Sequence, residues 1–201
     1  DNVALNSATL PHTSPSTVAY WNSKIGGRHF LQRIPNVHLP PATICHSAHE
    51  VITVASAHSS PLFIKSNVSV GGSGVLYFDR RAGASTASLT RRLLFKRRKS
   101  EQYKSSGTTA LTHPPYLIEE DVADNSMRVS PTADFLIHSP TNIDFIGIGQ
   151  QILTKSGAYR GVLFPIMAQP HLIERCVDAG SRICRELAGK GYVGPANIDY
   201  V

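Results

Sequence analysis

A glycine-rich loop between two apolar segments, with a lysine just before it, limits the fold of this chain more than any other feature. The stretch reads PLFIKSNVSVGGSGVLYF, residues 61–78. The two apolar runs predict strands. The backbone N–H groups of a glycine-rich turn can point inward and form a concave site for phosphate oxygens. Glycine clusters are also typical of ordinary hairpins, so the loop alone leaves both interpretations open.

Lys65 favours the phosphate interpretation. A long cation at the end of an apolar strand must place its ammonium group either in water or against an anion. At about 4 Å and an effective dielectric near 20, the attraction between an ammonium group and a phosphate charge is about 4 kcal/mol. A neutral backbone N–H contributes only about 1 kcal/mol net. We therefore expect Lys65 to dominate the affinity for an anion and the glycines to shape the site.

Composition restricts the class of protein. The chain has 201 residues, 41% of them hydrophobic and 17% charged, as in a globular protein with one large domain or two small lobes. No apolar run approaches the roughly 20 residues of a membrane-spanning helix, so we expect no membrane partner. Three cysteines without a CxxC pair favour a reducing, cytoplasmic location. The chain begins without methionine and stops after a strand-like segment, which suggests a fragment with further domains.

The formal net charge of +6 raises the question of a nucleic-acid partner. Much of the excess lies in RRLLFKRRKSEQYK, residues 91–104, which predicts a helix with an apolar stripe. This helix is either a solvated face with one buried edge or an electropositive rim that attracts a nucleotide. No RRM, KH or zinc-finger signature is present, so we expect no nucleic-acid partner. Salt-dependent nucleic-acid binding through this segment is the weaker alternative.

The order of apolar patterns predicts an α+β fold in two lobes. Residues 1–17 are rich in Ser, Thr, Asn and Pro, as in a linker or an arm from a preceding domain. Residues 18–115 predict a helical start, capped by Asn22 or Ser23, and then strand, helix, strand, glycine loop and strand. In residues 116–201, three strand candidates predict an antiparallel sheet and are followed by a long amphipathic helix and a last strand. The three candidates are PYLIEEDV, TADFLIHS and IDFIGIGQQIL.

Five short motifs occur in an informative order along residues 18–201. They are NSKIGGRHFLQRI, LPPATI, FIKSNVSVGGSGV, LIEEDV and GYVGPANID. Each is weak alone, but the ordered set resembles the ATP-grasp superfamily, to which biotin carboxylase and D-alanine–D-alanine ligase belong. The resemblance implies an ATP-grasp-like fold in which two small α+β lobes, with mainly antiparallel sheets, enclose a nucleotide cleft.

The resemblance also implies which residues bind ATP and Mg2+. Lys24 and Lys65 match the two family lysines that touch the ATP phosphates. Asp199 matches the first of the family's metal-binding acids, although a lone aspartate at a strand end is also typical of a solvated or capping residue. The mobile loop that closes over the phosphates would be Gly71, Gly72, Ser73 and Gly74.

The motif LIEEDV would bind the adenine ring. By resemblance, Glu119 would accept a hydrogen bond from the adenine amino group, and the backbone of Glu120 and Val122 would face the adenine edge. Without the surrounding motifs, these carboxylates would read as a solvated strand end.

Two positions depart from the family pattern. Asn197 stands where some family ligases carry an arginine that steadies the acyl phosphate, and no acid clearly matches the usual ribose contact after Val122. The family's ExN metal motif follows on the next strand, and this chain ends before it. Lys155 and Arg160 are either donors to the γ-phosphate or the acceptor carboxylate, or surface charges.

These residues imply an ATP-dependent ligase that joins a small-molecule carboxylate to an amine through an acyl phosphate. Such an enzyme supplies cations and alignment, so it needs no nucleophile of its own. The alternative is a catalytically degenerate ATP-binding module of a larger protein, which the asparagine at 197 and the missing ribose acid would permit.

Overall fold

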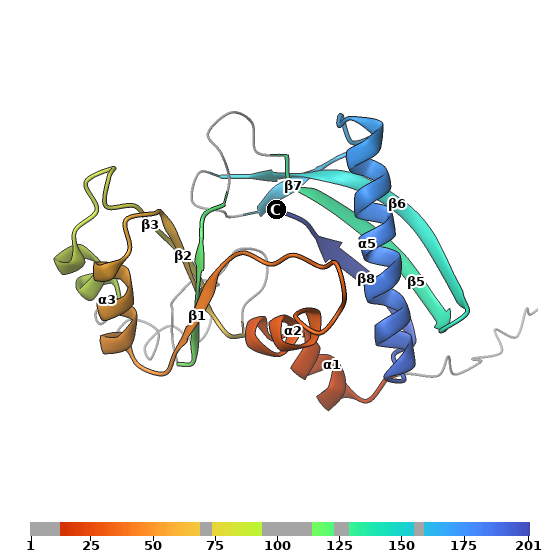
Figure 1. Cartoon of the computed structure of the whole chain (residues 1–201), viewed down its shortest axis with the longest axis horizontal. Coiled ribbons are helices and arrows are strands. Elements are labelled where there is room, and N and C mark those ends of the chain that lie inside the picture. The colour runs from red at the N-terminus through yellow and green to blue at the C-terminus, as the bar shows by residue number, and fades with distance from the viewer. Residues whose placement is uncertain (1–12, 69–73, 94–113, 123–128, 155–158) are drawn as a thin grey trace, which may run out of the picture.

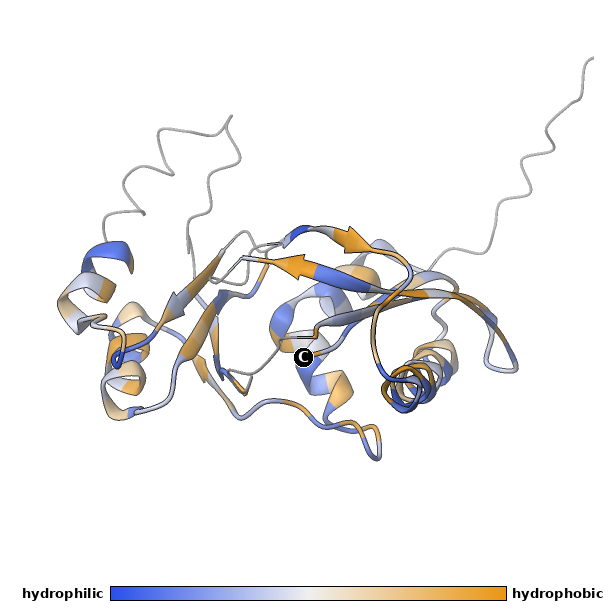
Figure 2. Ribbon diagram, turned by 90° about the horizontal axis from the view of Figure 1, so that it is seen from above, coloured by the Kyte–Doolittle hydropathy of each residue, from blue (hydrophilic) through white to orange (hydrophobic). Residues whose placement is uncertain are grey.

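Two antiparallel sheets build the protein. The computed structural model describes residues 13–68, 74–93, 114–122, 129–154 and 159–201. Each sheet has four strands and belongs to a separate lobe (Figure 1). Hydrophobic residues run along the strands of both sheets (Figure 2). The predicted α+β class is therefore confirmed.

The first lobe has the strand order β1-β4-β2-β3, with helix α3 packed against it. Its core includes Val51 and Ala55 of α3 and Ile64 of β2, all with 0% exposure. The elements are β1 (Ala42–Cys45), α3 (Ala48–Ala57), β2 (Leu62–Ser66), β3 (Val75–Phe78) and β4 (Tyr116–Glu120).

Strand β4 corrects one expectation from the sequence, which grouped PYLIEEDV with the strands of the second half. In the structure β4 lies between β1 and β2 of the first sheet, with Ile118 opposite both Thr43 and Ile64. Its first three residues are buried, as a central strand requires. An apolar run predicts a buried strand but does not show which sheet the strand joins. The lobe boundary near residue 116 stays a prediction, and this strand argues for placing it later.

The second lobe has the strand order β7-β6-β5-β8, and helix α5 covers one face of its sheet (Figure 1). Phe135, Ile137 and Cys184 are almost fully buried between them. The sequence did not predict β7. The elements are β5 (Pro131–Ser139), β6 (Asn142–Leu153), β7 (Tyr159–Leu163), α5 (Pro170–Gly189) and β8 (Gly194–Asp199).

Two short helices lie between the first sheet and α5 (Figure 1): α1 (Pro15–Asn22) and α2 (Lys24–Leu31). Ser23 separates them, and its hydroxyl accepts a hydrogen bond from the Gly26 N–H at 3.0 Å, so it is the predicted N-cap. Trp21 contacts Tyr192 after α5, with 6.0 Å between ring centroids. The helices thus touch both the first lobe and the end of the second.

The basic segment is described only as far as residue 93. Residues 86–93 are helical. Leu93 is 3% exposed, whereas Arg91 and Arg92 are exposed, as expected for a solvated helix with one buried edge. Residues 94–104 lie outside the described part of the chain. None of the helices in the described part is long and apolar enough to cross a membrane.

Candidate functional site

Residues from both lobes line two adjoining cavities of about 660 and 470 Å3. Lys24, Lys65, Asn197 and Asp199 line both, and Glu119 lines the larger one. The fold therefore brings together the two predicted phosphate lysines, the predicted metal acid and one predicted adenine residue from α2, β2, β8 and β4. They are separated by up to 175 positions, from Lys24 to Asp199.

Lys24 is the first residue of α2, and the backbone holds it beside the glycine loop. Its N–H donates to the Asn67 carbonyl at 2.8 Å, and the Ile25 N–H donates to Asn67 Oδ1 at 3.0 Å. Asn67 directly follows β2, so these bonds fix the start of α2 against the strand that carries Lys65.

The ammonium group of Lys24 has no ion-pair partner among the described residues, although the side chain is half-buried. Burial lowers the pKa of Lys24 most. The nearby Lys65 lowers it further, while Asp199 and Glu119 raise it. A partly desolvated cation beside a second cation is an environment that an anion would stabilise.

Lys65 and Arg28 both pair with Glu119. Glu119 Oε1 accepts from Arg28 Nη1 at 3.0 Å, and Oε2 accepts from Lys65 Nζ. Arg28 also donates to the Pro40 carbonyl at 2.5 Å. The side chains of Arg28 and Glu119 are only 10% and 13% exposed, so this is a partly buried cluster with two positive charges and one negative.

Arg28 was missed by the sequence analysis. It lies four residues after Lys24 on α2, which puts both side chains on one helix face. The four-residue spacing from Lys24 was the signal in the sequence for Arg28, because the first and fifth residues of a helix point in nearly the same direction.

The other predicted adenine residues lie at the exit of β4. The N–H of Glu120 donates to the Pro41 carbonyl at 2.9 Å, which removes it as a donor to a base. The Glu120 carboxylate lies 3.8 Å from His58 Nδ1. Val122 is 53% exposed. The adenine assignments of Glu119, Glu120 and Val122 stay proposals.

The predicted loop and donor residues are only partly described. Gly74 closes the base of the loop, where its carbonyl accepts from the Ser66 N–H at 2.8 Å. Arg160 lies in β7 and is exposed, and its neighbours Tyr159 and Val162 line the smaller cavity whereas Arg160 does not. The residues that lie outside the described part of the chain are Gly71, Gly72, Ser73 and Lys155.

A glycine shapes the wall of the smaller cavity. A Cβ at Gly149 of β6 would lie 2.6 Å from Val162 Cγ2 and 2.9 Å from Phe164 Cζ. Only a residue without a side chain lets the Phe164 ring come this close to the strand. The Phe164 and Val162 side chains are apolar parts of the wall of the cavity that Asp199 also lines.

Hydrogen bonds hold the strands beside Asp199. Thr132 is paired with Asp199, and Asp134 with Asn197, across β5 and β8. Thr132 Oγ1 donates to Asp199 Oδ1 at 2.8 Å, and Asn197 Nδ2 donates to both Thr132 Oγ1 and Asp134 Oδ1 at 2.8 Å. No motif in the sequence points to Thr132 or Asp134, because their role depends on the register of two strands more than 50 residues apart.

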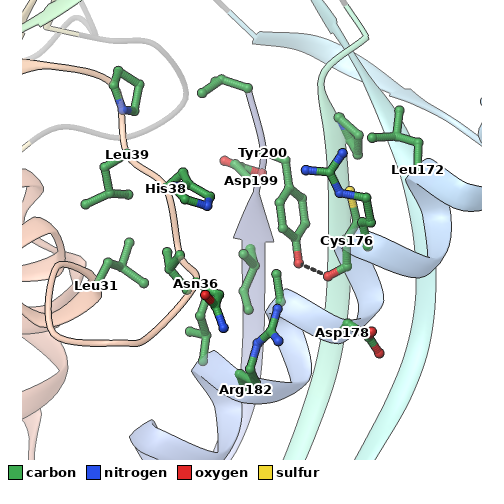
Figure 3. Close-up of a pocket in the computed structure, with 18 of the residues that line it drawn as sticks. Leu31, Asn36, His38, Leu39, Leu172, Cys176, Asp178, Arg182, Asp199 and Tyr200 are labelled. Atoms are coloured by element: carbon green, nitrogen blue, oxygen red, sulfur yellow. Dashed lines mark hydrogen bonds between the residues drawn. The ribbon is translucent and has the colours of Figure 1, made fainter.

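A third cavity, of about 370 Å3, lies between α5 and the segment that follows α2. In the view of Figure 3, Leu39 and His38 lie on one side of β8, and Cys176 and Leu172 lie on the other. The Tyr200 hydroxyl donates to the Cys176 carbonyl at 2.5 Å, and burial raises the pKa of Tyr200. This cavity contains neither Lys24 nor Lys65.

The described residues fit a magnesium ion only together with phosphates. No group of three or more His, Cys, Asp or Glu residues among them is arranged to hold a metal ion. Mg2+ keeps several waters and is usually bound by one or two carboxylates plus substrate phosphates. Asp199, beside two lysines, suits that shared arrangement, and it does not suit a metal held by protein alone.

Comparison with known proteins identifies the fold. No protein-family model matches the sequence, and neither does any curated protein. Among solved structures, the biotin carboxylase domain of Hydrogenobacter thermophilus 2-oxoglutarate carboxylase is similar over 92% of this chain, with a TM-score of 0.64 and 14% identity. D-alanyl-alanine synthetase A from Vibrio cholerae is similar over 92%, with a TM-score of 0.60 and 12% identity. The chain has the ATP-grasp fold.

A third structure supports this identification and shows how much of the neighbours is covered. Phosphoribosylamine–glycine ligase from Thermotoga maritima is similar over 91% of this chain, with a TM-score of 0.61 and 16% identity. This chain spans 37%, 52% and 45% of the carboxylase domain, the synthetase and the ligase. The first of these was solved with MgADP, ADP and bicarbonate. The predicted ATP-grasp resemblance is confirmed at the level of the fold.

Proposed function

We propose that this chain is the nucleotide-binding part of an ATP-dependent ligase that joins a carboxylate to an amine through an acyl phosphate. The observation that carries the proposal is the half-buried Lys24 ammonium, which has no ion-pair partner among the described residues and lines the same cavities as Lys65 and Asp199. The ATP-grasp fold of the solved neighbours supports it.

In this proposal the two adjoining cavities form one cleft, whose residues hold the triphosphate of ATP in place. Lys24 would hold phosphate oxygens directly, since no carboxylate among the described residues pairs with it. Lys65 would also bind the phosphates, after breaking its ion pair with Oε2 of Glu119. Glu119 would keep its ion pair with Arg28 through Oε1. Asp199 would contribute one carboxylate oxygen to Mg2+, and that ion would offset phosphate charge as the γ-phosphoryl group is transferred.

The chemistry would proceed in two steps. A substrate carboxylate oxygen attacks the γ-phosphorus, the bond from that phosphorus to the β–γ bridging oxygen breaks, and ADP leaves. An amine nitrogen then attacks the acyl carbon, the bond from carbon to the phosphate oxygen breaks, and phosphate leaves as the nitrogen loses a proton to solvent. The cleft cations would stabilise the developing negative charge, and its walls would align the reactants.

A nucleotide-binding module without ligase activity is the second candidate. It is favoured by Asn197, whose amide nitrogen donates to Thr132 and Asp134. Both N–H groups are then used, so Asn197 cannot replace an arginine as a donor to an acyl phosphate.

Calorimetry followed by a product assay tests both candidates. Titrating ATP with and without Mg2+ should show binding that Mg2+ strengthens. ADP and phosphate release should then be measured with pooled carboxylates and amines. Release that depends on both pools supports the ligase, binding without release supports the module, and no binding in a folded protein contradicts both.

We also expect ATP binding to take up a proton at alkaline pH. Burial and Lys65 lower the pKa of Lys24 below its ordinary 10.5, and a bound phosphate would raise it again. The bound state therefore holds the proton more tightly, so ATP affinity should fall as the pH rises through the lowered pKa. Calorimetry at several alkaline pH values, in buffers of different ionisation enthalpy, measures this uptake.

The matched control for this proton uptake is Lys24→Arg, because an arginine stays protonated throughout this pH range. The buffer dependence of the binding enthalpy should be lost in that variant. Equal proton uptake by both proteins would show that another group titrates.

A further inference from the structure

Three side chains behind Asp199 form a chain of hydrogen bonds in which each donor direction is determined. The chain runs from Asp134 through Asn197 and Thr132 to Asp199, and each of its three contacts is 2.8 Å long. All four residues lie on the paired strands β5 and β8.

The direction follows from the chemistry of each group. The ionised carboxylate of Asp134 can only accept, so the Asn197 atom that faces it must be the amide nitrogen. That nitrogen has two N–H groups, and the second points at Thr132 Oγ1. The Thr132 hydroxyl accepts this bond, so its own proton is directed to Asp199 Oδ1.

These hydrogen bonds leave the two carboxylate oxygens of Asp199 in different environments. Its Oδ1 is occupied by the Thr132 hydroxyl, while its Oδ2 has no hydrogen-bond donor among the described residues. Thr132 is 7% exposed, so water competes little for its hydroxyl, whereas Asp199 is exposed and lines both cavities that contain Lys24 and Lys65. One oxygen of the carboxylate is thus held by a hydrogen bond, and the other is left available to a ligand.

We infer that Thr132, Asn197 and Asp134 are positioning residues that hold the Asp199 carboxylate in a single orientation, with Oδ2 toward the metal ion of a bound Mg–nucleotide. The inference rests on the proposed function, and it gives Asn197 a role other than that of the family arginine. Residues that hydrogen-bond to a metal ligand typically affect metal affinity by about 10- to 100-fold.

Mn2+ binding to the ADP complex tests the inference without an activity assay. Free Mn2+ is counted by electron paramagnetic resonance while the protein is saturated with ADP, and metal-free ADP affinity is measured by calorimetry. Thr132→Val, which keeps the shape and removes the hydroxyl, should weaken Mn2+ binding about ten-fold. Its metal-free ADP affinity should stay unchanged, because Lys24 and Lys65 are intact.

Three variants make the result specific. Thr132→Ser keeps the hydroxyl and should restore Mn2+ affinity. Asn197→Ala changes an exposed side chain, so it should fold, and it should weaken Mn2+ binding a few-fold because the Thr132 hydroxyl can then rotate. Thr53→Val makes the same change at an exposed position of α3, in the other lobe, and should have no effect.

The outcomes separate the inference from the proposed function. Wild-type Mn2+ affinity in both folded Thr132→Val and Asn197→Ala would overturn the inference and leave nucleotide binding standing. If Thr132→Val does not fold, Asn197→Ala alone decides. Failure of the wild-type protein to bind ADP would overturn the proposed function and the inference with it.

Discussion

Replacing Lys24 by methionine is expected to weaken ATP binding more than ten-fold. The methionine keeps the stem and removes the charge from a half-buried ammonium that has no ion-pair partner among the described residues. At an effective dielectric near 20, the attraction between an ammonium group and one phosphate charge is about 4 kcal/mol. A ten-fold loss of affinity corresponds to only ~1.4 kcal/mol. Calorimetric titration with ATP measures the change.

Lys65→Met provides an informative comparison for Lys24→Met. Lys65 is already paired with Glu119, so binding a phosphate must replace that ion pair rather than create a new one. We expect a loss of about ten-fold, smaller than the loss for Lys24→Met. Lys190→Met, at the exposed end of α5, is the matched control and should bind ATP like the wild type. If the folded Lys24→Met variant bound ATP with wild-type affinity, Lys24 could not be a phosphate-binding residue.

Local patterns predicted the elements of this fold well. The cap at Ser23, the strands on both sides of the glycine loop and the long helix before β8 all follow from signals within a few residues. The ordered motifs also selected Lys24, Lys65 and Asp199, and the structure places them around one cleft. The metal and phosphate roles of these residues stay proposals.

Features that depend on strand pairing were not predictable in this way. Nothing within PYLIEEDV shows that β4 lies between β1 and β2. This placement brings Glu119 to Lys65 and Arg28, and it turns an apparently solvated carboxylate into the partner of two cations. Thr132 likewise gains its role only because β5 is aligned with β8 at Asp199.

Strand β7 was missed for a related reason. Its residues, YRGVL, include a glycine and an arginine, and four of the five positions are exposed, so they lack the alternation that marks a half-buried strand. Pairing with β6 stabilises it instead. In the sequence Arg160 therefore stands out as either a donor or a surface charge, whereas in the structure Val162 of the same strand lines the cavity.

Gly180→Ala is expected to destabilise the second lobe by about 1–3 kcal/mol, the usual cost of overpacking a core. A Cβ at this position of α5 would lie 2.5 Å from the Phe135 ring and 2.6 Å from the Tyr200 hydroxyl. Phe135 is 2% exposed, and side chains in a close-packed core shift only at a cost. Tyr200 would have to give up its bond to the Cys176 carbonyl.

The matched control for Gly180→Ala is Gly189→Ala, at the end of the same helix. Its Cβ would meet nothing within 4 Å, and alanine favours a helix over glycine by up to about 1 kcal/mol. Urea unfolding followed by circular dichroism should therefore give a lower midpoint for Gly180→Ala and an equal or higher one for Gly189→Ala. Because Tyr200 follows Asp199, displacing its ring should also weaken Mn2+ binding to the ADP complex at urea concentrations where the protein is still folded. Equal midpoints for the two variants would mean that α5 can move away from the sheet to make room for the added methyl group. The close packing of Gly180 against Phe135 and Tyr200 would then not determine the position of β8.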